Sequence, residues 1–144
     1  MNKDIIRKSI DSVWQRRDLD ALPEFWRTDC VNNALRPSQQ GLEALRAYHE
    51  EKFKQLEGFS NIRIELIQQI EEEDKVVTHF VISGEQTGFF SSLPPTGKTI
   101  LLPIIRIDRL REGKIAEHWC VEDFADVFWQ IQRREGINPA RLSG

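Results

Sequence analysis

The feature that most constrains the fold is a change of period within residues 113–130. Glu112-Gly113 predicts a turn, so residues 115–121 are expected to return as the second strand of a β-hairpin. Apolar residues then follow at helical spacing, at Phe124, Val127, Phe128 and Ile131. The chain must therefore pass from a strand directly into a helix whose apolar face packs on the layer beneath it.

Helical spacing dominates the first part of the chain. An amphipathic pattern ends near Arg17, a second short helical piece covers residues 19–26, and a third helix is expected over residues 41–57. Residues 28–40 contain Pro37 and many polar side chains, which indicates a loop. The helices are thus expected before any strand.

Strand periods dominate the second part. Residues 61–71, 76–87 and 98–111 join the 115–121 segment as four strands of antiparallel type. Helices followed by strands predict an α+β domain with the helices on one face of the sheet. Pro103 lies inside the third strand, and because proline cannot donate a ladder hydrogen bond it indicates a sheet edge or a bulge.

Length and charge narrow the classes of function. A chain of 144 residues fits one domain, here residues 1–144, with residues 136–144 expected as a loosely held tail. Lys and Arg number 20 against 23 Asp and Glu, so the basic surface that a nucleic-acid partner requires is missing. No apolar run approaches the roughly 18 residues of a membrane span. We expect a cytoplasmic protein with no nucleic-acid or membrane partner.

Cysteine and histidine spacing gives no sign of a metal centre. Cys30 and Cys120 lie far apart and neither belongs to a CxxC pair, while His49 and His79 show no ligand spacing. Glycine-rich loops for phosphates or dinucleotides are also absent from the sequence. We therefore expect no metal and no cofactor.

Two motifs carry a family resemblance. The run Gly113-Lys114-Ile115, Glu117-His118-Trp119 and Asp123 resembles the C-terminal signature of the SnoaL-like polyketide cyclases, a branch of the nuclear transport factor 2-like superfamily. Upstream, residues 83–88 and 93–98 are similar to the glycine- and proline-rich run of the same family. The resemblance covers roughly residues 4–132.

The resemblance implies a particular shape. The expected fold is a cone-shaped barrel, in which a strongly curved, mainly antiparallel sheet wraps around the N-terminal helices and encloses an apolar pocket open at one end. Members of the family pair through the outer face of the sheet, so a homodimer is expected. Apolar residues on both faces of one strand, from Leu101 to Ile105, are consistent with such an interface.

The resemblance also implies an activity, a cofactor-independent acid/base reaction on a small hydrophobic carbonyl compound. Asp123 matches the family's general acid/base, which takes a proton from an activated carbon before aldol-type ring closure; isomerisation and hydration are related outcomes. From the residues alone, Asp123 can equally cap the last helix. His118 is the second catalytic candidate, as a hydrogen-bond donor to an enolate or to Asp123.

Five residues are expected to bind the substrate. Trp14, Tyr48 and Trp119 are candidate walls, and Gln86 and Asn33 are candidate anchors for a carbonyl or enolate oxygen. Gln86 and Asn33 stand where the family has histidine, so they can hydrogen-bond but cannot titrate near neutral pH. Strand alternation places His118 and Trp119 on opposite faces, and we take Trp119 as the residue that faces the pocket.

Two other classes of function remain open. A non-catalytic carrier of a small hydrophobic ligand would keep the aromatic residues without the histidines. A dimeric interaction domain would have its pocket filled by bulky side chains. The deciding geometry is whether the Asp123 carboxylate faces an enclosed cavity within hydrogen-bond reach of Gln86 or Asn33.

Overall fold

A computed structural model of the chain describes residues 1–133, and it is an α+β fold built on one five-stranded sheet. The expected tail, residues 136–144, lies outside the described residues. The strands are β1 (Trp26–Asn32), β2 (Phe59–Glu72), β3 (Lys75–Gln86), β4 (Thr99–Arg111) and β5 (Lys114–Glu122). The α-helices are α1 (Asn2–Ser9), α2 (Leu22–Phe25), α3 (Leu42–Gln55) and α4 (Phe124–Gln132), with a π-helical segment at Ile10–Gln15 and a 3₁₀ turn at Leu19–Ala21.

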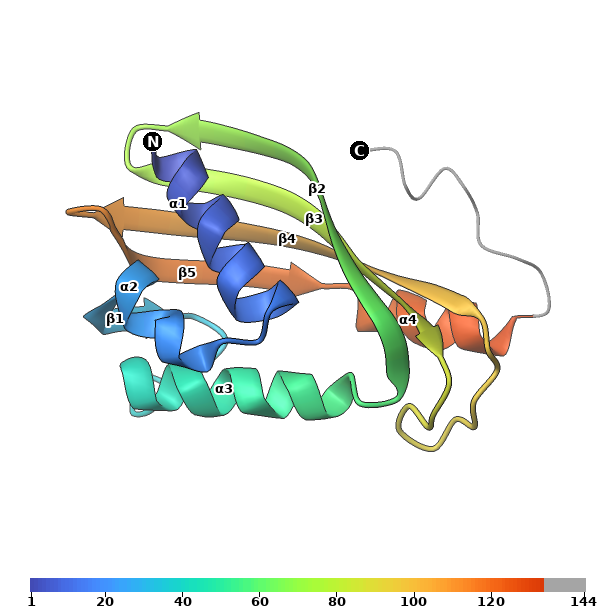
Figure 1. The fold of residues 1–144 in the computed structure, drawn as a ribbon. Helices are drawn as coiled ribbons and strands as arrows, with labels where there is room; N and C mark the ends of the chain where they lie inside the picture. The colour runs from blue at the N-terminus through green and yellow to red at the C-terminus, as the bar shows by residue number, and fades with distance from the viewer. Residues whose placement is uncertain (134–144) are drawn as a thin grey trace.

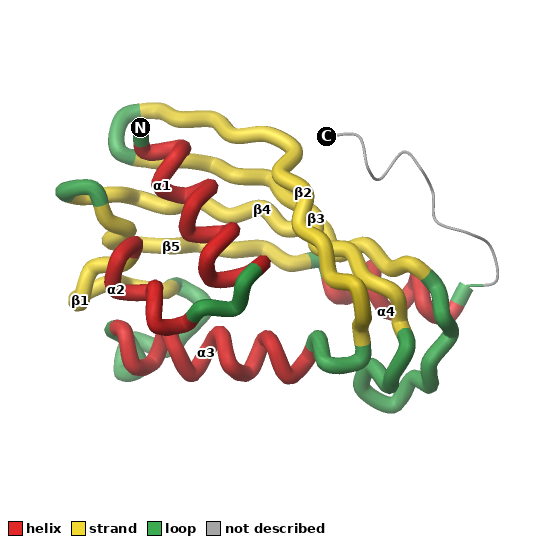
Figure 2. Tube along the Cα trace, in the orientation of Figure 1, coloured by secondary structure: helices red, strands yellow, loops and turns green. Residues whose placement is uncertain are grey.

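The sheet is strongly curved and wraps around the N-terminal helices. Its strand order is β1-β5-β4-β3-β2, with three antiparallel pairs and one parallel pair, β1 with β5. Figure 1 and Figure 2 show α1 and α3 against the concave side, β2 and β3 bending toward the end of α3, and α4 at that same end of the molecule. The expected cone is confirmed as a curved sheet that is not closed into a barrel.

One strand was missed by the sequence pattern. Residues 26–32 form β1, where a helix end and a loop were expected. Trp26, Cys30 and Asn32 are buried, but Thr28 is exposed because the register shifts between Trp26 and Val31, so the strand has no regular alternation to recognise. Asn32 pairs in register with His118 of β5. This parallel strand therefore forms one wall of the space beneath the helices.

Pro103 is compatible with an interior strand because β5 ends beside it. The last residue of β5, Glu122, pairs with Ile104, and the Pro103 carbonyl accepts a hydrogen bond from the Asp123 backbone N–H at 3.3 Å. An N–H at position 103 would face the same side as the Pro103 carbonyl. Because β5 has ended there, no strand carbonyl is left without a donor. The proline thus marks a local edge within β4, as the sequence predicted.

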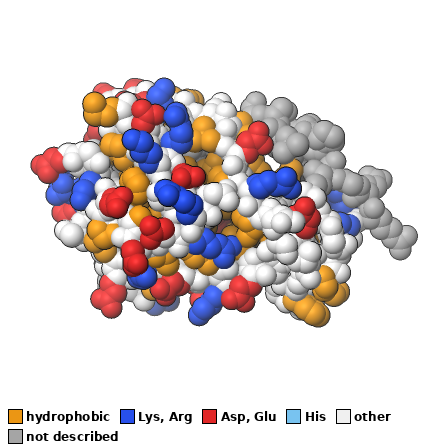
Figure 3. Space-filling model, viewed as in Figure 1, with side chains coloured by type: hydrophobic (Ala, Val, Ile, Leu, Met, Phe, Trp, Pro, Cys, Tyr) orange, Lys and Arg blue, Asp and Glu red, His pale blue; other side chains and the backbone are white. Residues whose placement is uncertain are grey.

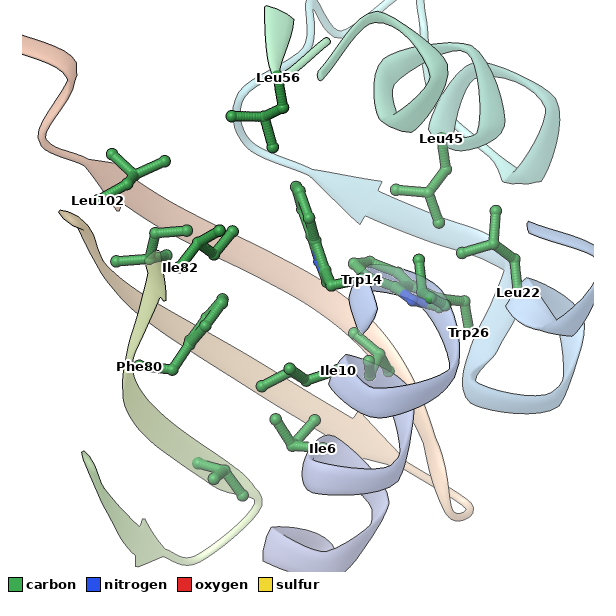
Figure 4. Close-up of a cluster of buried hydrophobic side chains, with 14 of the residues drawn as sticks. Ile6, Ile10, Trp14, Leu22, Trp26, Leu45, Leu56, Phe80, Ile82 and Leu102 are labelled. Carbon is green, nitrogen blue, oxygen red and sulfur yellow. The ribbon is translucent and has the colours of Figure 1, made fainter. Parts of the chain in front are cut away.

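The core fills the concave side of the sheet. Ile6, Ile10 and Trp14 project from the N-terminal helical segment toward Phe80 and the neighbouring strand residues, as Figure 4 shows. Burying one such side chain stabilises the fold by roughly 1.5–3 kcal/mol. The amphipathic pattern that ends near Arg17 is confirmed as α1 and the π-helical segment, whose wider turn brings Trp14 into the interior.

Helix α4 takes the place that β5 leaves beside β4. The Gln130 amide donates to the Leu101 carbonyl at 2.7 Å and accepts from the Leu101 N–H at 2.9 Å, which are the bonds that a neighbouring strand would make. The Lys98 ammonium contacts the backbone carbonyls of Gln130, Ile131 and Arg133 at the C-terminal end of α4, where a positive charge suits the helix dipole. These contacts hold α4 at the open end of the cone.

Replacing Gln130 with methionine should destabilise the protein without altering its shape. The change leaves the buried N–H and C=O of Leu101 without partners, so the free energy of unfolding should fall by roughly 2–4 kcal/mol. Urea denaturation of Gln130→Met beside Gln132→Met measures this, because Gln132 is an exposed glutamine on the same helix. Equal stability of the two variants would contradict the role assigned to the Gln130 amide.

Candidate functional site

Polar side chains gather on the inner face of β4 and β5. The antiparallel register pairs Arg106 with Cys120 and Asp108 with His118, so these four side chains share one face. Together with aromatic residues from the helices and β1, most of them line a small cavity, with room for about one water molecule. Its lining consists of Trp14, Trp26, Tyr48, His49, Phe80, Ile104, Arg106, His118, Cys120 and Glu122. A polar cluster therefore lies inside the cone, beneath the helices.

Asp108 is the centre of this cluster. Its side chain is fully buried, and its two oxygens accept from Arg106 Nε at 2.7 Å and Arg106 Nη2 at 2.9 Å. The His118 Nδ1 atom lies 2.8 Å from Asp108 Oδ1. Burial alone would raise the pKa of Asp108, but the charges and hydrogen bonds of Arg106 and His118 hold it at about 2. The carboxylate is therefore ionised at neutral pH.

His118 is held as a neutral base. Burial lowers its pKa below the ordinary value, and the nearby Arg106 charge acts in the same direction against the attraction of Asp108. Because an ionised carboxylate can only accept, Nδ1 carries the proton and Nε2 carries a lone pair. No residue among 1–133 makes a hydrogen bond to Nε2, and the ring packs edge-on against Trp26 with centroids 5.2 Å apart. The geometry is that of a histidine oriented by a carboxylate.

A second ion pair lies beside the cavity, which its Glu122 member lines. Lys52 Nζ of α3 lies 2.7 Å from Glu122 Oε2, and the two side chains are 19% and 8% exposed. The same ammonium lies 5.4 Å from the ring centroid of Tyr48 and 5.0 Å from that of Phe124. Burial and the negative charge of Glu122 raise the pKa of Tyr48, so its hydroxyl stays protonated. The hydroxyl is a permanent donor at the cavity wall.

A separate apolar pocket lies toward the open end of the cone. It is small, since the centre of a water molecule can move through only about 20 Å³ of it. Its lining consists of Leu56, Phe59, Ile62, Ile82, Ser83, Gly84, Phe90, Ile100, Leu102, Phe124 and Val127. Ile82 and Leu102 line it, two positions along the strands from Phe80 and Ile104 of the inner cavity. The two spaces therefore follow one another along the concave face, with the polar one deeper.

The outer pocket is covered by the connection between β3 and β4. Gly58 accepts hydrogen bonds from the Thr87 and Gly88 backbone N–H groups at 3.0 and 2.9 Å, and a Cβ on Gly58 would lie 2.2 Å from the Phe89 carbonyl oxygen. The close approach requires glycine. Phe89 is 65% exposed near this tip, where Figure 3 shows a group of hydrophobic side chains on a face otherwise mixed in charge.

Lys52 stands between the inner cavity and the surface. It lines an open groove with Lys54, Phe89, Phe90 and other residues, while its partners Glu122 and Tyr48 line the inner cavity. The inner cavity is narrow, since the centre of a water molecule can move through only about 10 Å³ of it. That volume is about what one water molecule occupies.

Asp123 and Gln86 are placed away from the inner cavity. Asp123 is exposed and caps α4, where its Oδ1 accepts from the Asp126 N–H at 3.0 Å. Gln86 is fully buried, but its amide holds the β3–β4 connection by donating to Pro94 O and accepting from Thr96 Oγ1. The Asp123 carboxylate therefore does not face a cavity beside Gln86, because neighbouring groups of the chain bind both side chains.

Asn33 and Trp119 also lie elsewhere. Asn33 is exposed and donates to Glu117 and to the His118 carbonyl. Trp119 pairs with Ile107 on the outer face of the sheet, so the expected alternation with His118 is confirmed but the choice of Trp119 as the inward residue is wrong. Trp26 supplies the wall instead. Trp14 and Tyr48, the other two candidate walls, line the cavity, and so does His118, which the choice of Trp119 had placed on the other face.

Several site residues had no motif to reveal them. Arg106 and Asp108 occupy inward positions of one predicted strand, where apolar side chains are the rule, and Glu122 directly follows another predicted strand. The sequence did offer one sign of this site. Arg106 and Asp108 alternate along one predicted strand, and the next strand contains His118. Trp26 and His49 could not be assigned because β1 and the facing side of α3 were not known.

Solved structures share this fold. IdmH from Streptomyces antibioticus superposes with a TM-score of 0.77 at 21% identity, over 92% of this chain and 99% of that one. A SnoaL-like polyketide cyclase from Agrobacterium tumefaciens strain C58 gives 0.71 at 20% identity, over 91% and 98%. TsrD from Streptomyces laurentii gives 0.72 at 20% identity, over 91% and 95%. The protein therefore has the nuclear transport factor 2-like architecture of these chains.

The sequence assigns the family within that architecture. The SnoaL-like polyketide cyclase profile matches residues 4–131, so the chain belongs to the SnoaL-like polyketide cyclase family. No curated protein sequence matches the chain. Within residues 1–133, no helix has the length and apolar character of a membrane span, and no group of three or more His, Cys, Asp or Glu side chains is arranged to hold a metal ion.

The buried His49 should make the protein sensitive to mild acid. Its Nδ1 contacts the Leu45 carbonyl at 2.8 Å, and burial, with the charges of Arg106 and Lys52, lowers its pKa from 6.5 to about 4. The unfolded chain therefore binds a proton below pH 6.5 that the folded chain refuses until about pH 4, so stability falls as pH falls through this window. The loss from His49 between pH 7 and 4.5 is about 2.5 kcal/mol.

Urea unfolding of His49→Gln at pH 7 and pH 4.5 measures this contribution. The variant should lose about 2.5 kcal/mol less than the wild type over the interval, with the remaining slope coming from other groups, including His118. His79→Gln is the matched control, because His79 lies in β3 and pairs with Ile105 outside this cavity. An unchanged slope in His49→Gln would contradict the assignment.

Proposed function

We propose that the protein is a cofactor-independent acid/base enzyme that acts on a small hydrophobic carbonyl compound. The observation that carries this proposal is the buried Asp108–His118 pair, which presents a neutral imidazole Nε2 to a cavity. Membership of the SnoaL-like polyketide cyclase family supports the same class of reaction. The reaction is aldol-type cyclisation, or a related isomerisation or hydration.

His118 takes the proton in this reaction. A C–H bond next to the carbonyl breaks, the proton moves to Nε2, and the electron pair passes to the carbonyl oxygen as an enolate. The enolate carbon then attacks a second carbonyl of the same substrate, and the imidazolium returns its proton to the new alkoxide. Asp108 keeps Nδ1 protonated and stabilises the imidazolium that forms.

The other cavity residues bind the substrate in this proposal. Tyr48 supplies a protonated hydroxyl, and Trp14 and Trp26 are flat walls for a planar body. Asp123 acts as the cap of α4, which its bond to the Asp126 N–H supports. The proton acceptor proposed for this chain is therefore His118 and not Asp123.

A carrier for a small hydrophobic ligand is the second candidate. The outer pocket favours it, because all of its lining residues are uncharged and most are apolar. Such a ligand would be held near Phe59, Phe90 and Phe124 without reaching His118. Binding without proton exchange is the expected behaviour of a carrier.

Solvent deuterium exchange at the activated carbon of an aromatic β-keto ester distinguishes the two candidates. The wild type should catalyse exchange, and His118→Gln should slow it by about 10²–10⁴-fold, the usual contribution of a general base. Asp108→Asn should also slow it, since the histidine loses its tautomer and its counter-charge. Tryptophan fluorescence follows binding in each variant.

Asp123→Asn is the control, because asparagine also caps a helix. It should exchange at nearly the wild-type rate. Loss of exchange in Asp123→Asn with retention in His118→Gln would contradict the proposed base. Binding by the wild type without any exchange would favour the carrier.

We also propose a homodimer that forms through the outer face of the sheet. Ile105 is 49% exposed and pairs with Val121, which is 73% exposed, so adjacent strands present apolar side chains outward. Paired apolar side chains at this exposure favour burial against a second copy. The proposal extends the interface implied by the family resemblance.

Sedimentation velocity measures this association. Val121→Lys should shift the protein from dimer to monomer, because a buried unpaired charge opposes the contact. Ala47→Lys introduces the same charge on an exposed position of α3, on the opposite side of the sheet, and should remain a dimer. A wild type that sediments as a monomer would contradict the proposal.

A further inference from the structure

Arg106 has donor capacity that the fold does not use. Its guanidinium carries five N–H groups, of which Nε–H and one N–H of Nη2 bind Asp108. Within residues 1–133, no acceptor contacts Nη1. The residue is only 3% exposed and lines the inner cavity. Both N–H groups of Nη1 are thus available to whatever occupies that space, as is the second N–H of Nη2.

The pairing with Asp108 does not account for this arrangement by itself. Nη1 is not among the fully enclosed side-chain atoms that lack a partner, so its N–H groups keep accessible surface on the cavity side. A guanidinium that is largely withdrawn from solvent still needs an acceptor there, from water or from a ligand. The face of Trp26 lies 5.9 Å from the Arg106 Cζ atom and shields the group further from water. An acceptor that arrives with a ligand would satisfy the two N–H groups.

The charges around the cavity limit which acceptor can bind. Arg106 is balanced by Asp108, and Lys52 is balanced by Glu122, so the surrounding side chains form two neutral pairs. A free anion would add an uncompensated charge to this buried site. A neutral acid that passes its proton to His118 would add none, because an anionic oxygen and an imidazolium form together.

We propose that Arg106 Nη1 binds an anionic oxygen that is created in the cavity when His118 accepts a proton from the ligand. The ligand class is a weak carbon or oxygen acid with a planar apolar body, such as an enolisable ketone or a phenol. For a phenol, the O–H bond breaks, the proton passes to His118 Nε2, and the phenolate oxygen accepts from Nη1. The inference deepens the proposed function, because the enolate oxygen would take the same position.

4-Nitrophenol is the probe, since its phenolate absorbs visible light and its neutral form does not. At a pH at which the free compound is mostly neutral, binding to the wild-type protein should generate phenolate absorbance. 4-Nitrotoluene has the same shape without the acidic proton and should bind at least tenfold more weakly. Absence of phenolate absorbance from bound 4-nitrophenol, or absence of binding, would overturn the inference.

Arg106→Lys and Arg106→Gln test the residue directly. Both should form at least tenfold less bound phenolate than the wild type, while 4-nitrotoluene affinity changes less than twofold. An undiminished phenolate signal in both variants would overturn the role of Nη1. Asp123→Asn is the matched control and should behave as the wild type, because Asp123 caps α4 outside the cavity.

A measurement on the wild type covers the case in which both Arg106 variants fail to fold. In protein labelled with ¹⁵N-arginine, one guanidinium resonance should shift on addition of 4-nitrophenol and stay in place on addition of 4-nitrotoluene. Equal shifts with both compounds would overturn the inference.

Failure of this inference is distinguishable from failure of the proposed function. Bound phenolate without deuterium exchange on the β-keto ester would leave the oxygen site standing and remove the enzyme assignment. Exchange by the wild type without bound phenolate would keep His118 as a base and overturn the Arg106 site.

Discussion

The interior of this protein depends on the ion pair between Arg106 and Asp108. Both side chains are buried under apolar helices, and the two parallel hydrogen bonds between them compensate charges that would otherwise be costly there. Asp108 also holds His118 in one tautomer, which ties β4 to β5 through their side chains as well as their backbones. The Asp108 carboxylate therefore both stabilises the fold and orients the proposed base.

The curvature of the sheet makes such an interior possible. Bending β2 and β3 toward α3 leaves a concave side that the N-terminal helical segment fills with Ile6, Ile10 and Trp14. Apolar side chains pack the concave side near α1. The side chains around His118 include polar and charged groups, and those toward α4 are mostly apolar and uncharged. The apolar space toward α4 and the titratable groups around His118 therefore follow one another along the concave face.

Much of the fold followed from residue periods, because alternation and helical spacing report burial directly. Long strands such as β3 and β4 were predictable, as was the helix after residue 123. The residues of the site were harder to predict. A carboxylate after a strand looks the same in sequence whether it caps a helix or enters a cavity, and Asp123 caps. Strand alternation also shows only that two neighbouring residues face opposite sides, and it does not show which of them faces inward. We chose Trp119, and the structure has His118 facing inward.

The sequence by itself determined the α+β class, the family, the strand-to-helix junction and the presence of His118 and Tyr48 among the candidates. Local spacing is sufficient for these, since each depends on residues within a few turns or strand positions of one another. Only the tertiary structure decided that Arg106, Asp108 and His118 form one buried cluster and that β1 places Trp26 beside it. These contacts join strands across the sheet, and their register is set by packing beneath the helices, which no local pattern contains.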